Sequence, residues 1–141
     1  MSDSQVPRRH GWLFAALLAG LAYIVIGRWF PNPATNARNW RLAAWAISGA
    51  VYVAHMWYEH FGRCSSPRTL AAHTATGVAI GGFGLAVFGL AHSVAQTSAV
   101  RPIWLISLVA WPAITAIPAY VVALVVALAV ARLQGTNRSS A

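Results

Sequence analysis

The chain has 141 residues, of which 58% are hydrophobic and 9% are charged, and its formal net charge is +8. This composition excludes a separate soluble domain and is typical of a single helical membrane unit. The basic residues are all arginines at the ends of apolar runs, so the positive charge indicates anchoring at lipid headgroups and excludes the basic stripe of a nucleic-acid-binding protein.

Four long apolar stretches fill most of the chain: residues 11–30, 41–61, 69–92 and 103–131. About 20 predominantly apolar residues are enough to cross the hydrocarbon core as a helix, and unbroken runs of this kind are not barrel strands. The sequence therefore predicts an all-α fold, an integral membrane four-helix bundle with short loops that contacts the lipid bilayer. We predict a polar N-terminal segment, a single four-helix transmembrane domain and a disordered C-terminal tail at residues 1–10, 11–133 and 134–141, respectively.

The first apolar stretch follows a pair of arginines, Arg8 and Arg9. A twin-arginine pair before an apolar run also occurs in export signals. This run is longer than most signal cores and no convincing cleavage site follows it, so we expect a retained first helix. Pro31 and Pro33 then prevent that helix from continuing.

The connection between the second and third stretches is short. Gly62 can end the second helix, and Pro67, after a pair of serines, completes a tight turn. A connection of this length predicts an antiparallel hairpin of helices 41–61 and 69–92. Cys64 lies in this turn and is the only cysteine, which excludes an intramolecular disulfide.

The fourth stretch opens at Arg101 and Pro102, where a proline is tolerated in the first turn. Within it, Pro112 and Pro118 remove backbone hydrogen bonds and predict a kinked helix.

The arginines predict an orientation. Positive residues gather on the cytoplasmic side of membrane proteins, so the larger set favours a bacterial inner membrane protein with both termini in the cytoplasm. The two sets are Arg8, Arg9, Arg63, Arg68, Arg132 and Arg138 on one side, and Arg28, Arg38, Arg41 and Arg101 on the other.

Helix 41–61 carries the most informative polar pattern. Its two faces differ: the polar residues recur every three or four positions, and small or apolar residues fill the other side. The polar face predicts contacts inside the bundle, because lipid would leave these groups without partners. The polar face holds Trp45, Ser48, Tyr52, His55 and Glu59, and the apolar face holds Leu42, Ala46, Ala50, Val53 and Trp57.

His55 and His73 are expected about 8–9 Å inside the same membrane boundary, on the two helices of the hairpin. Tyr52, His55, Glu59 and His73 are therefore predicted to form one polar pocket. Glu59 is also a natural ion-pair partner for Arg63 at i+4. A structural role, in which these groups bind each other across helices and hold the hairpin, explains the pattern without further chemistry.

Two other roles for the pocket stay open. His55 and His73 could be the axial ligands of a haem b. A Tyr–His–Glu chain could carry protons, since imidazole titrates near neutral pH. A divalent metal would find only three ligands and no carboxylate pair, so we predict no metal site.

Helix 69–92 carries glycines at helical spacing, Gly77, Gly81 and Gly84, which form a surface that a neighbouring helix can approach closely. Two partners stay open for this surface, a helix of the same bundle or a helix of another protein.

The sequence shows no nucleophile–base arrangement, phosphate loop or carboxylate pair, and this favours a protein that is not an enzyme. The hypothesis is a small polytopic membrane protein, a non-enzymatic accessory or scaffold subunit that packs against other subunits of a membrane complex. One alternative is a haem b-binding electron-transfer protein that uses His55 and His73. A second alternative is a small transporter or proton-relay protein that uses Glu59.

Overall fold

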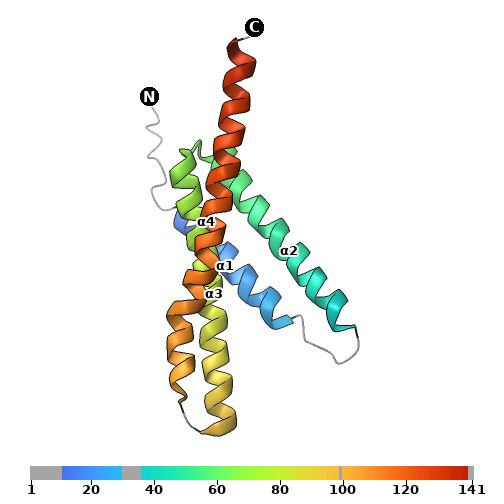
Figure 1. Ribbon diagram of the computed structural model, residues 1–141, viewed down its shortest axis with the longest axis vertical. Coiled ribbons are helices and arrows are strands. Elements are labelled where there is room, and N and C mark those ends of the chain that lie inside the picture. The colour runs from blue at the N-terminus through green and yellow to red at the C-terminus, as the bar shows by residue number, and fades with distance from the viewer. Residues whose placement is uncertain (1–10, 30–35, 99, 140–141) are drawn as a thin grey trace, which may run out of the picture.

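The computed structural model describes residues 11–29, 36–98 and 100–139, and in this part of the chain every regular element is helical (Figure 1). The predicted all-α fold with four helices is confirmed. The predicted segment 1–10, Pro31 and Pro33 lie outside the described residues. The elements are α1 (Gly11–Trp29), α2 (Ala37–Trp57), the π-helix η1 (Tyr58–Gly62), α3 (Pro67–Thr97) and α4 (Pro102–Ser139).

Three helices, α1, α3 and α4, are long and apolar enough to cross a membrane. Many of their large apolar side chains are exposed, as contact with lipid requires. The fourth predicted span, helix α2, is not apolar enough to meet the same hydropathy criterion. Its less apolar positions include Arg41, His55 and several tryptophans, where the other helices have aliphatic residues.

The register of the contacts gives each helix its direction. Along α1 and α3 the contacting residue numbers rise together, so the two helices are parallel. Trp12 stacks on His73, Gly20 lies beside Ile80, Gly27 beside Leu85, and the Arg28 guanidinium lies 5.5 Å from the centre of the Phe88 ring. Helix α4 runs antiparallel to α3, because Gly82 lies against Pro112 and Gly89 against Trp104.

Glycines make α3 the central helix, since they let both neighbours approach its backbone. A Cβ at Gly81 would lie 2.7 Å from the Cβ of Tyr23 on α1, and a Cβ at Gly82 would lie 2.8 Å from Oγ1 of Thr115 on α4. Gly84 is similarly filled by Ile24. The glycines of α3 are thus occupied within the chain.

Short polar contacts set the start of α3 and accompany the prolines of α4. Ser66 caps α3 by accepting a hydrogen bond from the Thr69 amide at 3.3 Å, and Pro67 follows in the first turn. Pro112 and Pro118 lie inside α4, which nevertheless continues through both. Beside Pro112, the Thr115 hydroxyl donates to the Trp111 carbonyl at 2.8 Å.

At its C-terminal end α4 differs from the predicted boundary. The sequence places a disordered tail from residue 134, whereas the helix continues to Ser139. Extension of an existing helix adds one backbone hydrogen bond per residue, and no proline interrupts these last turns. Residues 140–141 lie outside the described part.

Helix α2 leaves the other helices. Its C-terminal half lies against α1 and also contacts α3 and α4, but its N-terminal half diverges from them (Figure 1). A continuous outward face of α2 is exposed, and no heavy atom outside its own turn lies within 4 Å of a Cβ placed at Gly49. We call this the α2 outer face, and it consists of Leu42, Ala46, Gly49, Ala50, Val53 and Trp57.

The α1–α3 packing is testable with a matched pair of glycine substitutions. Gly81→Ala should lower the free energy of unfolding by about 1–3 kcal/mol, because its new methyl group overlaps the rigid Cβ of Tyr23. Gly49→Ala, where the methyl group meets open space, should leave stability unchanged or slightly raised. Denaturant unfolding in mixed micelles measures both, and equal effects of the two substitutions would contradict the packing.

Candidate functional site

The candidate site begins where α2 turns into the π-helix η1. The wider π turn changes which side chains face the bundle, and such turns are often found at functional sites. Glu59 lies in this turn with 0% of its surface exposed. It is the only acidic residue in the described part of the chain. A fully buried carboxylate is costly unless other groups bind it, so its partners define the site.

Three side chains lie around one oxygen of Glu59. Its Oε2 lies 2.8 Å from Nδ1 of His73, accepts a hydrogen bond from the Ser65 hydroxyl at 3.0 Å, and lies 3.7 Å from Nε of Arg63. The predicted Glu59–Arg63 pair is therefore present, as the longest of the three contacts. The shortest contact, between Glu59 and His73, joins η1 to α3.

Trp12 extends the contact to a third helix. Its indole ring stacks on the imidazole of His73, with centroids 4.3 Å apart and ring planes 8° from parallel. We call Trp12, Glu59, Arg63, Ser65 and His73 the Glu59 clamp. The clamp joins α1, η1 and α3 at one end of the structure.

The other predicted pocket residues face different neighbours. The Tyr52 hydroxyl donates a hydrogen bond to the carbonyl of Ala119 on α4. The His55 ring is 6% exposed and packs on Gly77, whose Cβ position lies 3.1 Å from Cε1 of the ring. Among the described residues, neither ring nitrogen of His55 has a hydrogen-bond partner.

The register of the hairpin explains this separation. Helices α2 and α3 are antiparallel, so Glu59 lies level with His73 while His55 lies level with Gly77, one helical turn further along α3. Of the four residues predicted to form one pocket, the structure brings Glu59 and His73 into contact. Tyr52 and His55 lie on the same helix as Glu59 but contact other elements.

The haem b hypothesis for His55 and His73 stays a prediction. The Nδ1 atom of His73 binds Glu59, and Trp12 stacks on one face of its ring. A hydrogen bond at Nδ1 is the usual arrangement when Nε2 is the ligand, so these contacts do not exclude ligation. His55 lies in the wall of a groove of about 550 Å³ between α1 and α2, to which α3 contributes no residue. A bis-histidine haem needs both imidazoles to face one gap. Nor do three metal-ligating side chains gather anywhere in the described part of the chain.

Sequence reasoning missed two members of the clamp. Trp12 has the position of an interfacial tryptophan near a span end, and Ser65 has the position of an ordinary turn residue. Their contacts with His73 and Glu59 depend on the parallel packing of α1 on α3 and on the π turn. The nearness of Ser65 to a lone carboxylate was the one available signal.

Comparisons of the chain with protein-family models, with curated proteins and with solved structures found no match. The contacts themselves define a buried, charge-assisted hydrogen-bond centre. Three neighbouring groups surround Oε2 of the enclosed carboxylate, while its Oε1 is buried with no hydrogen-bond partner among the described residues.

The clamp predicts a ranking of stabilities. Glu59→Ala should cost about 3–5 kcal/mol, because it leaves His73 and Arg63 facing a buried gap. Ser65→Ala should cost about 1 kcal/mol, the typical value of one hydrogen bond. His92→Ala is the control, since His92 is an exposed residue of α3 outside the clamp. Unfolding free energies measure the ranking, and a Glu59→Ala protein as stable as the His92→Ala protein would exclude the clamp.

Proposed function

We propose that this chain is a four-pass membrane protein that acts as a non-enzymatic accessory subunit, with the α2 outer face bound to a helix of another membrane protein. The observation that carries the proposal is the α2 outer face, an exposed helix surface whose centre at Gly49 is approached by no other part of the described chain.

The parallel packing of α1 and α3 supports a fourth crossing. If α1 and α3 both cross the bilayer in the same direction, the chain between them has to return, and α2 is the helix in that interval. Continued by η1, α2 extends from Ala37 to Gly62, roughly 39 Å at 1.5 Å per residue. This length exceeds the hydrocarbon thickness of about 30 Å.

The α2 outer face has the composition of a helix-packing surface. Ala46, Gly49 and Ala50 leave room for a second backbone, and the larger Leu42, Val53 and Trp57 frame them. Small residues are enriched where membrane helices touch, because association there depends on close van der Waals packing. In the sequence, the glycines of α3 also indicated a helix-packing surface, but side chains of α1 and α4 already occupy the space beside them.

The contacts favour this role over a proton relay. A relay requires hydrogen-bonding groups in sequence across the bilayer. Within the described residues, Glu59 connects to His73 and Ser65, while the Tyr52 hydroxyl binds α4 and the His55 nitrogens have no partner. A structural role for Glu59 accounts for its contacts and requires no proton path across the bilayer.

The proposed orientation places both termini and the connection around Cys64 in the cytoplasm of a bacterial cell. The structure places Gly11 next to Arg63, since a Cβ at Gly11 would lie 2.8 Å from the Arg63 guanidinium. The start of α1 and the α2–α3 connection thus share one end, where the larger set of arginines is expected.

Thiol labelling tests the four crossings. Cys64 is exposed, and a membrane-impermeant maleimide should reach it from one face of sealed vesicles only. In a Cys64→Ser background, Asn39→Cys and Gln96→Cys should react from the opposite face. Labelling of Asn39→Cys and Cys64 from the same face would show that α2 does not cross and would overturn the four-pass proposal.

Partner binding tests the accessory role. The wild-type protein, purified in mild detergent, should carry a stoichiometric membrane partner, and Gly49→Leu should lose at least about tenfold of it because the larger side chain blocks close approach. Val109→Leu, an equally apolar change at an exposed position of α4, is the control. Quantitative mass spectrometry measures the ratio. A wild-type monomer without a partner, or full retention by Gly49→Leu, would refute the role.

A further inference from the structure

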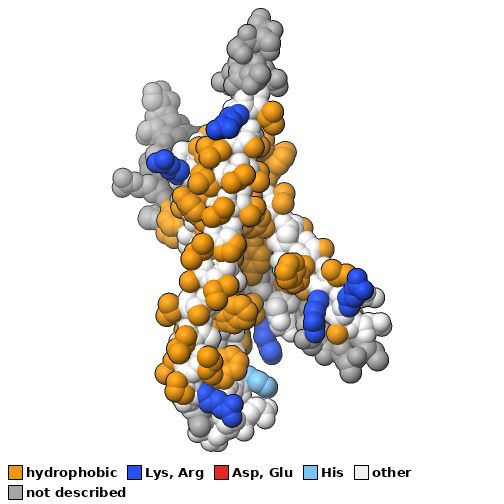
Figure 2. All heavy atoms as spheres, in the orientation of Figure 1, with side chains coloured by type: hydrophobic (Ala, Val, Ile, Leu, Met, Phe, Trp, Pro, Cys, Tyr) orange, Lys and Arg blue, Asp and Glu red, His pale blue; other side chains and the backbone are white. Residues whose placement is uncertain are grey.

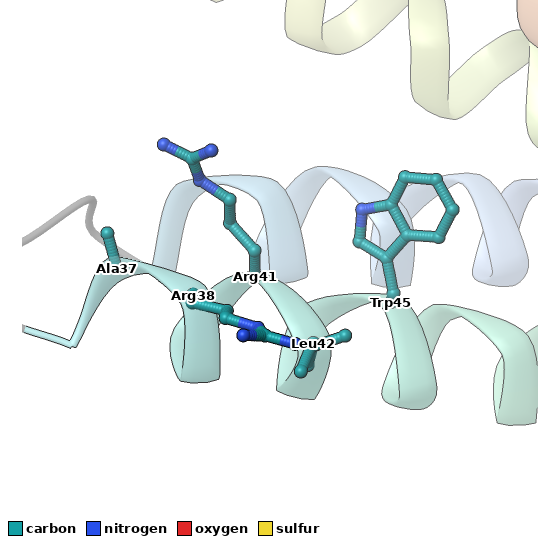
Figure 3. Close-up of a pocket in the computed structure, with 5 residues that line it drawn as sticks. All are labelled: Ala37, Arg38, Arg41, Leu42 and Trp45. Carbon is teal, nitrogen blue, oxygen red and sulfur yellow. The ribbon is translucent and has the colours of Figure 1, made fainter.

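The first turns of α2 form a shallow concavity of about 420 Å³ that belongs to neither the Glu59 clamp nor the α2–α4 contact. It is lined by Ala37, Arg38, Arg41, Leu42 and Trp45, all from one helix. Figure 3 shows the Arg41 and Trp45 side chains rising from the same side of α2, with Arg38 extending along the helix beside Leu42. Two guanidinium groups thus lie next to a large apolar surface, because Trp45 is 80% exposed.

The position of this concavity along α2 matches a membrane interface. Arg41 and Glu59 are 18 residues apart, roughly 27 Å at 1.5 Å per residue, close to the thickness of the hydrocarbon core. If the Glu59 clamp lies near one boundary, Arg38 and Arg41 lie at the headgroups of the other. Leu42 and Trp45 then follow on the hydrocarbon side. Arginine outside and tryptophan inside is the usual order at a membrane boundary.

The charge at this end is positive. Arg28 ends α1, Arg101 precedes α4, and Arg38 and Arg41 open α2, and basic side chains are visible over the lower ends of these elements in Figure 2. The acidic residue of the described part, Glu59, is buried at the opposite end. An anion with an apolar tail is complementary to this combination of charge and surface.

We infer that Arg38 and Arg41 bind the phosphate of an anionic phospholipid, whose acyl chain lies over Trp45. A guanidinium group donates two parallel hydrogen bonds to phosphate oxygens, and the paired arginines on adjacent turns engage one headgroup. The flat Trp45 ring offers the acyl chain its contact surface. The inference rests on the proposed crossing of α2, which sets the depth of the two arginines.

Lipid titration of the purified full-length protein tests the site. The protein in detergent is titrated with phosphatidylglycerol or phosphatidylcholine, and native mass spectrometry measures the bound lipid. The wild type should prefer phosphatidylglycerol, and Arg38→Gln/Arg41→Gln should lose at least about tenfold in apparent affinity. Arg101→Gln removes one positive charge from the same end, at an exposed residue outside the α1–α3 packing, and should stay within about twofold of the wild type.

Each other outcome overturns the inference. Equal binding of the two lipids removes the role of the headgroup charge, and an equal loss in Arg101→Gln and in Arg38→Gln/Arg41→Gln indicates diffuse attraction instead of a site. Displacement of phosphatidylglycerol by inorganic phosphate assigns the arginines to a soluble anion.

A second variant keeps the test valid if Arg38→Gln/Arg41→Gln fails to fold. Arg38→Lys/Arg41→Lys keeps the charge and loses the paired hydrogen bonds, so it should bind several-fold more weakly than the wild type, and unchanged affinity would contradict phosphate recognition by guanidinium. Thiol labelling of Asn39→Cys reports the crossing independently, so failure of the lipid site and failure of the four-pass proposal are distinguishable.

Discussion

Close parallel packing of α1 on α3 is the constraint on which the rest of the structure depends. Gly20 and Gly81 bring the two backbones together, and the contacts from Trp12–His73 to Arg28–Phe88 keep them in one register. Parallel neighbours in one chain need a connecting segment that returns along their length. That task falls to α2, the helix with the least apolar composition. Its polar residues lie on an element that its neighbours hold at its C-terminal end, while its N-terminal half diverges from them (Figure 1).

The Glu59 clamp is the point where this returning helix is fastened. A carboxylate in an apolar surrounding is stable only with its partners in place, so Glu59 specifies one arrangement of α1, η1 and α3 more sharply than aliphatic packing does. His73 supplies the closest contact and Trp12 orients the imidazole. Beyond the clamp, α2 diverges from the other helices, and its outer face is exposed.

The sequence predicted the helices well, because apolar runs, prolines and caps are local signals. Ser66 and Pro67, which the sequence assigned to the turn before a helix at residue 69, instead cap and open α3. The site was harder to predict. The i+4 spacing suggested Arg63 as the main partner of Glu59, whereas the π turn and the hairpin register bring His73 closer. The equal depth expected of His55 and His73 differs from the observed register by about one helical turn. The register between two helices depends on how their whole surfaces pack, so it cannot be predicted from the spacing of a few residues in the sequence.

Helix α2 combines three surfaces that the bilayer treats differently. Its polar side chains near η1 are turned inward, its first turn carries arginines suited to headgroups, and its middle presents alanine and glycine. Alanine and glycine gain little from lipid compared with leucine or valine, which fill the exposed positions of α4. A crossing helix that gives up this apolar area is better matched to the backbone of another helix than to acyl chains. The low hydropathy of α2 is thus consistent with the proposed protein neighbour on its outer face.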